Sequence, residues 1–321
     1  MKKILLVDAD STIPNLALMK LSTWYKKQGH YITLYKANLP YYPNQKKRVY
    51  NVPIGFDKTY CSIIFEGNKN YIQANNINFG GSGYDLKTVL PLEIEQCLPD
   101  YSIYPENNIS YGFITRGCIR KCSFCKVFEK EGDIKKVADI KDIVRHKKVK
   151  FLDNNILAYS DHREILQELI IKSIKCQFNQ GLDIRLVDEE NSKLLSKLNY
   201  LGEYIFAFDD WRYKDLITEK LKILLWRKPW QFKFFVYIHP DMLITDTIKR
   251  INWLKNQQCL PYIMRDISCW NNTNSEFFTD IAAYTNQVHL FKKLDFNIFL
   301  EKRHTNLNRI IKSKKIWEAN L

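Results

Sequence analysis

Three of the eight cysteines lie close together in the sequence, at Cys118, Cys122 and Cys125, with the spacing C-x3-C-x2-C. Thiolates are soft ligands that bind iron-sulfur clusters, and three of them on one short loop can hold three irons of a four-iron cube. The fourth iron then has no protein ligand and can bind another molecule. The spacing therefore predicts a 4Fe-4S cluster with one open iron, where chemistry can occur.

Zinc and disulfide chemistry fit these cysteines less well. Structural zinc uses four nitrogen or sulfur ligands, usually in two spaced pairs, and no second C-x2-C or H-x3-H pair occurs in the 321 residues. A disulfide framework is typical of short secreted chains, whereas this chain is long and we expect no secretory signal in it. The remaining cysteines are scattered without a pairing pattern and are interpreted as ordinary buried residues: Cys61, Cys97, Cys176, Cys259 and Cys269.

The cysteines follow a predicted strand. The run 110–115 is strand-like and ends at Arg116 and Gly117, so the cysteine loop lies just past the carboxyl end of a strand. In (β/α) barrels, active sites are built on that face. With the aromatic Phe124 directly before the last cysteine, the loop resembles the motif C-x3-C-x-aromatic-C of the radical S-adenosylmethionine (radical SAM) superfamily. The resemblance implies a cluster held by the three cysteines, with Phe124 beside the bound cofactor, and an electron donor of the flavodoxin or ferredoxin type.

The chain after this loop alternates between helix-like and strand-like segments. Together with the strand at 110–115, strands are predicted at 149–153, 175–179, 204–208, 232–238 and 261–265. Helices are predicted between them, at 137–147, 161–173, 188–198, 213–225 and 245–256. Such alternation favours a parallel sheet with helical crossovers. The predicted fold class is therefore α/β, with a partial (β/α)6 TIM-type barrel of the radical SAM kind.

Polar residues collect where these strands end: Asp153, Asn154 and Asn155; Gln180, Asp183 and Arg185; Asp209 and Asp210; His239; and Arg265 and Asp266. Side chains at the carboxyl ends of barrel strands face the mouth of the barrel, where a ligand can use them. Asp and Asn also cap helices, so these residues have a second interpretation. The set as a whole predicts a binding site at the strand ends.

The radical SAM resemblance implies that the open iron binds the amino and carboxylate groups of S-adenosylmethionine and that nearby residues bind the rest of it. The candidates for cofactor binding are Phe124, Asp153, Asn154, Asn155, Gln180, Asp183, Arg185 and Asp209. The segment 153–155 would lie near the amino group, although the usual Gly-Gly-Glu form of that motif is absent. The segment 180–185 supplies candidates for the ribose and the carboxylate, because the planar fork of Arg185 matches a carboxylate.

The segment 1–105 is predicted to form a separate α/β domain, with strands at 3–7, 31–35, 62–65 and 77–79 and a helix at 14–27. It resembles the Rossmann-like domain that precedes the barrel in cobalamin-binding radical SAM proteins. Those proteins use a D-x-H-x-x-G loop to place a histidine under the cobalt. The corresponding stretch, 8–14, has no histidine, and His30 follows the first helix. We therefore expect this domain without cobalamin.

The composition sets limits on partners and location. Hydrophobic residues make up 45% of the chain, enough for sizeable cores in two domains, and no stretch approaches the length of a membrane helix. We expect a protein of the reducing cytoplasm without a membrane partner. The formal net charge is +14, with basic clusters at 46–48, 135–150 and 302–315, a pattern typical of nucleic-acid binding. Because Lys is abundant throughout the chain, a nucleic acid is possible as substrate but not favoured.

These observations predict a radical SAM enzyme with a Rossmann-like domain at 1–105, a barrel at 106–270 and a C-terminal extension at 271–321 that closes the barrel. By the resemblance, the reduced cluster cleaves S-adenosylmethionine to methionine and a 5'-deoxyadenosyl radical, which abstracts hydrogen from an unidentified substrate. Two alternatives stay open. One is a nucleic-acid-modifying enzyme akin to methylthiotransferases, although no second cluster motif or RNA-binding domain is visible. The other is a non-catalytic iron-sulfur protein that transfers electrons or acts as a sensor.

Overall fold

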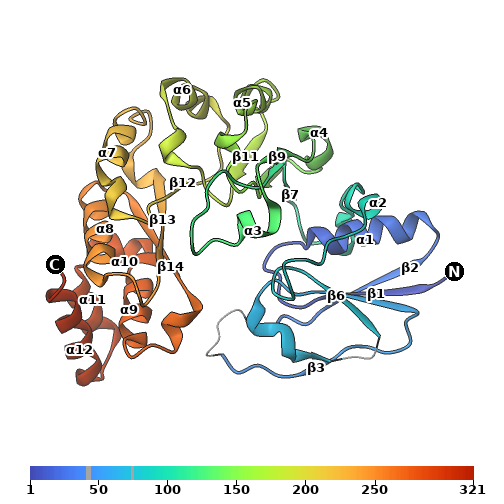
Figure 1. Ribbon diagram of the computed structural model, residues 1–321, viewed down its shortest axis with the longest axis horizontal. Helices are drawn as coiled ribbons and strands as arrows, with labels where there is room; N and C mark the ends of the chain where they lie inside the picture. Colours follow the sequence, from blue (N-terminus) through green and yellow to red (C-terminus); the bar gives the residue numbers. More distant parts are fainter. Residues whose placement is uncertain (41–44, 74–75) are drawn as a thin grey trace. The chain divides into compact units, whose positions relative to one another are not determined.

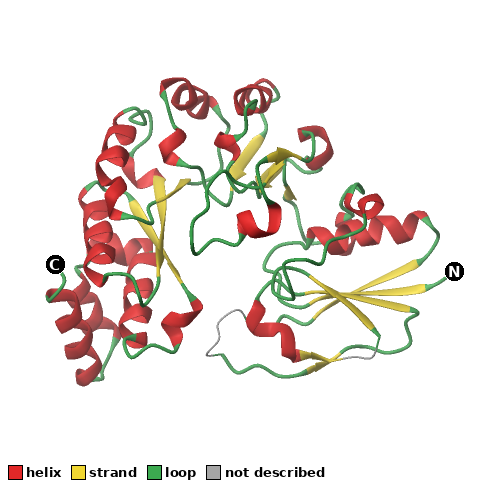
Figure 2. Ribbon diagram, viewed as in Figure 1, coloured by secondary structure: helices red, strands yellow, loops and turns green. Residues whose placement is uncertain are grey.

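The computed structural model describes residues 1–40, 45–73 and 76–321 (Figure 1). The chain divides into two compact units, Met1–Lys150 and Phe151–Leu321. Helices and strands alternate in both units, and most strand pairs are parallel (Figure 2). The predicted α/β class is therefore confirmed. The predicted domain boundaries at 105 and 270 stay predictions, because one compact unit can contain more than one domain.

A four-stranded parallel sheet with the order β2-β1-β4-β6 forms the core of the first unit. Its strands and first helices are β1 (Lys3–Asp8), α1 (Leu16–Lys27), β2 (Tyr31–Lys36), β4 (Lys58–Ser62), β6 (Ile77–Gly80) and α2 (Leu92–Glu95). The central strand β1 is buried on both faces, with Ile4 and Leu6 packed against α1 and α2, and Leu5 and Val7 in the cluster on the opposite face. A strand buried on both faces requires the continuous apolar run that the sequence contains.

Shorter elements complete the first unit. They are β3 (Tyr50–Asn51), β5 (Ile72–Gln73), β7 (Ser110–Gly112), β8 (Thr115–Arg116), α3 (Val127–Glu131), β9 (Lys135–Lys136), α4 (Ile140–Ile143) and β10 (Lys148–Phe151). Strands β3 and β5 pair in parallel, β8 and β9 pair antiparallel, and β7 is the neighbour of β10. This order of elements places the cysteine loop between β8 and α3.

Parallel strands in sequence order form the sheets of the second unit. They are β11 (Lys175–Phe178), β12 (Tyr204–Ala207), β13 (Phe232–Ile238) and β14 (Leu260–Arg265). The amide of Asn179, just after β11, donates to the carbonyl of Phe151 at 2.8 Å, and a parallel bridge joins Leu182 to Phe206 of β12. Neighbouring parallel strands joined by helical crossovers are what the predicted partial barrel requires. The complete six-stranded barrel stays a prediction.

The helices of the second unit are α5 (His162–Ile171), α6 (Glu189–Lys197), α7 (Lys214–Lys222), α8 (Ile244–Asn256), α9 (Ser275–Asn286), α10 (Val288–Lys293), α11 (Phe296–Arg303) and α12 (Leu307–Glu318). Helices α7 and α8 lie on the same side of β12 and β13 (Figure 1). Burial alternates along β13, where Phe234 and Val236 are fully buried whereas Lys233 and Tyr237 are partly exposed. One face of this strand therefore belongs to the core and the other carries polar groups. None of the described helices combines the length and the hydropathy that spanning a bilayer requires.

One predicted strand is wrong in its position. The sequence predicts a strand at 62–65, whereas β4 ends at Ser62. The amide of Ile63 still donates to the carbonyl of Gly80 in β6 at 2.9 Å. The two amides after it turn to Asp10, two residues past β1, whose carboxylate oxygens accept the N–H groups of Ile64 and Phe65 at 2.8 and 3.0 Å. A side-chain carboxylate thus satisfies amides that a longer strand would have paired with its neighbour.

One predicted helix is shorter than expected. The sequence predicts a helix at 137–147, whereas α4 covers only Ile140–Ile143. The hydroxyl oxygen of the buried Ser110 accepts the N–H groups of Arg145 and His146, both at 2.8 Å. These amides are therefore satisfied outside a helix, and the chain continues directly into β10.

Candidate functional site

The cysteine loop lies within the first unit and begins directly after β8. Its first residue must be a glycine, because Gly117 has φ +92° and a Cβ there would lie 2.3 Å from the carbonyl oxygen of Asp133. The amide of Cys118 donates to the carbonyl of Gly132 at 3.2 Å. The backbone therefore fixes where the loop begins.

An arginine before the loop joins it to the helix after the loop. Arg116 donates through Nε and Nη2 to the two carboxylate oxygens of Glu131 in α3, at 2.6 and 2.8 Å, and its Nη1 lies 3.3 Å from Glu95. Burial lowers the pKa of Arg116, but pairing with Glu131 and Glu95 outweighs burial and raises it. Such a bidentate pair has a defined geometry, so it holds the two ends of the cysteine loop together.

The three thiols of the loop are partly exposed, whereas the other five cysteines are buried. The sulfur of Cys118 accepts the amide of Arg120 at 3.3 Å, and the amide of Cys125 donates to the carbonyl of Cys122 at 3.0 Å. Within residues 1–40, 45–73 and 76–321, no three His, Cys, Asp or Glu side chains are grouped so as to hold a metal ion. The loop thus carries the three predicted ligands without gathering them into a preformed metal site.

The chemistry of this loop fits an iron-sulfur cluster. Its three side-chain donors are all sulfur atoms on one short segment, and iron-sulfur clusters prefer such soft ligands. Metal sites are also seldom preformed before the metal binds. The cations Arg120, Lys121 and Lys126 lie on the same segment; Lys121 lies over the ring of Phe128, and Lys126 pairs with Glu129. Phe124 has 38% of its surface exposed, so its ring is accessible to a bound group.

In the second unit, polar side chains following β10 and β11 contact one another. Asp183 accepts hydrogen bonds from Arg185 Nε at 2.6 Å and Nη2 at 3.0 Å, and Asn155 Nδ2 donates to the same carboxylate at 3.5 Å. The guanidinium of Arg185 lies over the ring of Tyr213, which follows β12. Burial lowers the pKa of Arg185, but the bonds and charge of Asp183 together with Tyr213 outweigh burial and raise it. The guanidinium that the sequence predicts as a candidate for a ligand carboxylate is thus bonded to Asp183 in this structure.

The other predicted cofactor residues near these strands lie differently. Asp153 is fully buried and Asn154 is partly exposed, both just after β10. Gln180 is exposed, whereas Asp183, three residues later, is buried. The structure therefore brings Asn155, Asp183 and Arg185 together, while Gln180 is exposed. The roles of all these residues in cofactor binding stay predictions.

A second polar group lies at the ends of β12, β13 and β14. Asp209 accepts the N–H of Tyr237 at 2.9 Å, and the hydroxyl of Tyr237 donates to Asp266 at 2.7 Å. His239 Nε2 lies 3.8 Å from Asp266, and His239 Nδ1 accepts the N–H of Asp241 at 3.1 Å. That bond assigns the proton of a neutral imidazole to Nε2, facing Asp266. His239 therefore lies between the carboxylates of Asp241 and Asp266 at the strand ends.

Asp209 and Asp266 have pKa values shifted in opposite directions, although burial raises the pKa of each. Burial raises the pKa of Asp209, and the N–H of Tyr237 and the positive charge of Arg250 offset this only in part. Burial also raises the pKa of Asp266, but hydrogen bonds from Ser268 and Tyr237 outweigh burial, so the pKa is lowered. Asp266 is therefore firmly a carboxylate, whereas Asp209 is the more readily protonated of the two.

Arg250, which the sequence analysis missed, supports this second group from α8. It is completely buried, and its Nη1 donates to the carbonyls of Phe208 at 2.9 Å and Tyr237 at 3.2 Å. Burial lowers the pKa of Arg250 to about 10, against the raising effect of Asp209. A single arginine in a helix gives no signal in the sequence. Tyr237 was missed for a similar reason, since an aromatic residue inside a strand usually belongs to the core.

Capping, the second interpretation of the strand-end acids, holds for three of them. The side chains of Asp183, Asp210 and Asp266 each accept the backbone N–H of the residue two positions later. These acids therefore have a local structural role, which does not depend on a ligand. In the part of the chain that the structure describes, Asp209 instead accepts the N–H of Tyr237 on the neighbouring strand.

The segment 8–14, at the end of β1, contains Asp8 and Asp10 but no histidine. At the carboxyl end of β1, Asp8 accepts the hydroxyl of Tyr104 at 2.7 Å, and Asp10 accepts backbone amides of the segment after β4. His30 instead accepts the N–H of Lys2, before the start of β1. The nearest histidine in the sequence thus lies at the other end of the strand. The absence of cobalamin from this domain stays a prediction.

Two solved structures that resemble this chain are of TsrM from Kitasatospora setae, described as a radical S-adenosylmethionine methyltransferase. The structure with cobalamin and a [4Fe-4S] cluster bound matches 83% of this chain and 75% of that chain, with a TM-score of 0.56 and 10% identity. The structure with tryptophan substrate and the SAM analogue aza-SAM bound matches 82% of this chain and 73% of that chain, with a TM-score of 0.58 and 11% identity.

At this level of identity the likeness shows the fold alone. No protein-family model matches the sequence, and no curated protein does. Because the match covers 83% of this chain, it extends over both compact units. The chain therefore shares the α/β fold of these TsrM structures.

Proposed function

We propose that this protein is a radical SAM enzyme that binds a 4Fe-4S cluster through Cys118, Cys122 and Cys125 and cleaves S-adenosylmethionine. The observation that carries the proposal is an accessible three-thiol loop, anchored by Arg116 and Gly117, in a chain with this fold. When bound, the cluster and the cofactor supply one-electron cleavage to methionine and a 5'-deoxyadenosyl radical. That radical would abstract hydrogen from the substrate, and a ferredoxin- or flavodoxin-type protein would supply the electron.

The residues at the strand ends are proposed to bind and orient the cofactor. The bidentate bond to Asp183 restricts the guanidinium of Arg185 to one orientation, which lowers the entropy lost when it meets an anionic group. Asn155 contacts the same carboxylate and extends the polar surface. Phe124, Asp153, Asn154, Gln180 and Asp209 are the remaining proposed cofactor contacts.

The first test is anaerobic reconstitution with iron and sulfide, followed by reduction with dithionite in the presence of S-adenosylmethionine. Chromatography would quantify 5'-deoxyadenosine, and iron, sulfide and cluster absorbance would be measured on the same samples. The test variant carries Cys118→Ala, Cys122→Ala and Cys125→Ala. The control is Cys97→Ala, which removes a buried thiol outside the loop. Circular dichroism would verify that both variants are folded.

The proposal expects 5'-deoxyadenosine from the wild type and from the control but not from the triple variant, which should also lose the cluster. A folded triple variant that retains stoichiometric iron and sulfide would overturn the ligand assignment. A fully loaded wild type that yields no 5'-deoxyadenosine would overturn the enzyme proposal and favour electron transfer or sensing. S-adenosylhomocysteine as the only product would indicate methyl transfer without reductive cleavage.

A further inference from the structure

The first unit contains a hollow that none of the proposed cofactor residues lines. It has a volume of about 620 Å³ and is lined by Asn108, Val144, Arg145, His146, Lys147 and Lys148. Asn108 precedes β7, and Lys148 is the first residue of β10. The hollow therefore lies at the amino ends of these two neighbouring strands, whereas barrel active sites lie at the carboxyl ends.

The charge of this basic hollow is not neutralised. The segment from Arg145 to Lys150 carries four Lys and Arg residues, and no Asp or Glu occurs between Asp142 and Asp153. Arg145, Lys147 and Lys148 are exposed, and among the described residues none of them is within ion-pair distance of a carboxylate. Cations gathered without counter-charges create a positive potential that attracts an anion.

The backbone that presents these cations is held in place. Ser110 accepts the amides of Arg145 and His146, and the ring of His146 contacts the ring of Tyr101 edge-on at 4.6 Å. Nη1 of Arg145 donates to the carbonyl of Lys141 at 2.7 Å, and the described residues supply no acceptor for its Nη2. A rigid backbone with available donors loses less entropy when a ligand binds.

We propose that the basic hollow binds the phosphate backbone of a single-stranded nucleic acid. Small-molecule sites enclose most of their ligand, whereas here consecutive side chains lie exposed along a surface segment and suit a strand that runs across them. Val144 and the ring of His146 add apolar surface, on which a base can rest. The formal net charge of +14 adds long-range attraction for a polyanion. This binding does not depend on the proposed cofactor chemistry.

The test measures fluorescence anisotropy of a labelled oligouridine with the full-length protein at increasing NaCl concentration. One variant carries Arg145→Glu, Lys147→Glu and Lys148→Glu. The control carries Lys193→Glu, Lys197→Glu and Lys249→Glu, three exposed residues of the second unit that give the same change in charge. The hollow variant is expected to bind at least about tenfold more weakly, and its slope of log Kd against log salt should fall by about 2, since each lost phosphate contact contributes about 0.7. The control should retain the wild-type slope.

Equal weakening in the two variants, or no salt-dependent binding by the wild type, would overturn the proposal. Displacement of the oligouridine by inorganic phosphate at matched ionic strength would assign the hollow to small anions instead. Equal binding of an oligoglutamate peptide is incompatible with a site for nucleic acid, because that peptide shares the charge sign but not the phosphate. Circular dichroism and 5'-deoxyadenosine formation, expected to be unchanged in the hollow variant, separate this proposal from a failure of folding or of the proposed function.

Discussion

At the scale of single residues, Arg250 supports the second strand-end group by satisfying the carbonyls of Phe208 and Tyr237. Arg250→Met keeps much of the apolar volume but leaves these carbonyls buried without their donor. The free energy of unfolding in urea is expected to fall by about 3 kcal/mol. The control is Lys249→Met at an exposed position of the same helix, with an expected change below about 0.5 kcal/mol. Similar small effects in both variants would show that the carbonyls find other donors.

Asp100 is a residue whose contribution depends on pH. Its carboxylate accepts the hydroxyl of Ser22 at 2.6 Å and lies 2.7 Å from Nζ of Lys26, both in α1. Burial raises the pKa of Asp100, but the bonds from Lys26, Ser102 and Ser22 outweigh burial and lower the pKa to about 2. An unfolded Asp has a pKa of about 4. The folded state therefore releases this proton more readily, and the stabilisation is present above about pH 4 and lost as the pH falls towards about 2.

Asp100→Asn is accordingly expected to lower the free energy of unfolding at neutral pH by about 1–2 kcal/mol. The difference between wild type and variant should shrink as the pH falls from about 4 to about 2. Urea denaturation at a series of pH values measures both effects. Asp215→Asn, which removes a carboxylate that is 89% exposed, is the control. If the free energies of unfolding of the wild type and of the Asp100→Asn variant differ by the same amount at every pH, the lowered pKa of Asp100 is contradicted.

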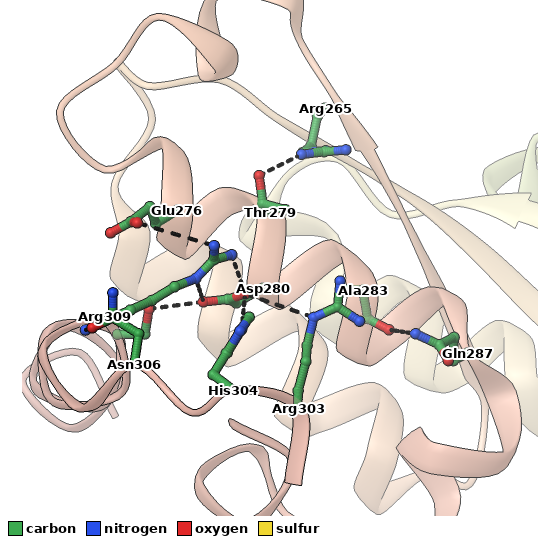
Figure 3. A network of polar contacts seen from close by, with 11 residues as sticks. Arg265, Glu276, Thr279, Asp280, Ala283, Gln287, Arg303, His304, Asn306 and Arg309 are labelled. Atoms are coloured by element: carbon green, nitrogen blue, oxygen red, sulfur yellow. Dashed lines mark hydrogen bonds and ion pairs between the residues drawn. The ribbon is translucent and has the colours of Figure 1, made fainter. Parts of the chain in front are cut away.

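At the scale of elements, the C-terminal helices meet at one buried carboxylate. Asp280 of α9 is fully buried and accepts hydrogen bonds from His304 Nε2 at 2.8 Å, Arg309 Nη2 at 2.6 Å and Ser313 Oγ at 3.0 Å (Figure 3). His304 follows α11, and the other two donors lie in α12. Polar bonds to one residue therefore join the last helices to α9.

Asp280→Asn is expected to release α12, because the amide cannot accept all these bonds and brings unneeded donors of its own. Hydrogen exchange of residues 307–318 should become faster by an amount equivalent to about 3 kcal/mol, while β13 keeps its protection. Asp295→Asn, whose side chain is 83% exposed and pairs with Lys255, serves as the control. Unchanged exchange in α12 would show that apolar packing alone holds this helix.

The cysteine loop depends on the backbone at its entrance. Gly117→Ala adds a Cβ that collides with the carbonyl of Asp133 at a residue with φ +92°, so the loop should shift and the reconstituted protein should hold less iron per chain than the wild type. Gly132→Ala is the matched control, since it also has a positive φ of +70° but has open space around the added Cβ. Equal iron contents in the two variants would mean that the collision has no influence on the ligands.

At the scale of the whole molecule, the net charge of +14 produces self-repulsion in the folded state. NaCl screens this repulsion, so Tm in differential scanning fluorimetry is expected to rise by about a few degrees as salt is added. The variant with Lys193→Glu, Lys197→Glu and Lys249→Glu carries less net charge and should show a smaller rise. A Tm that falls with salt would mean that attractive ion pairs outweigh the repulsion.

The fold could be predicted in outline because hydrophobic periodicity is a local property of the chain. Strands are present in each of the six segments predicted from 110 to 265, and helices lie between them. The two clear errors have a common origin in contacts from residues distant in sequence. Asp10 accepts the amides of Ile64 and Phe65 after β4, and Ser110 accepts the amides of Arg145 and His146 after α4. No local pattern contains that information.

The candidate site also has a part that the local sequence determines and a part that contacts between distant residues determine. The sequence by itself determined the three candidate thiol ligands and their strand-loop setting, because ligands that lie within one short loop are close together in any fold of that loop. Only the tertiary structure decided that Asn155 reaches Asp183, that Tyr237 links Asp209 to Asp266, and that Arg250 lies buried behind them. These contacts join different strands and helices, and their distances depend on how the strands align and pack, which residue type and spacing do not specify.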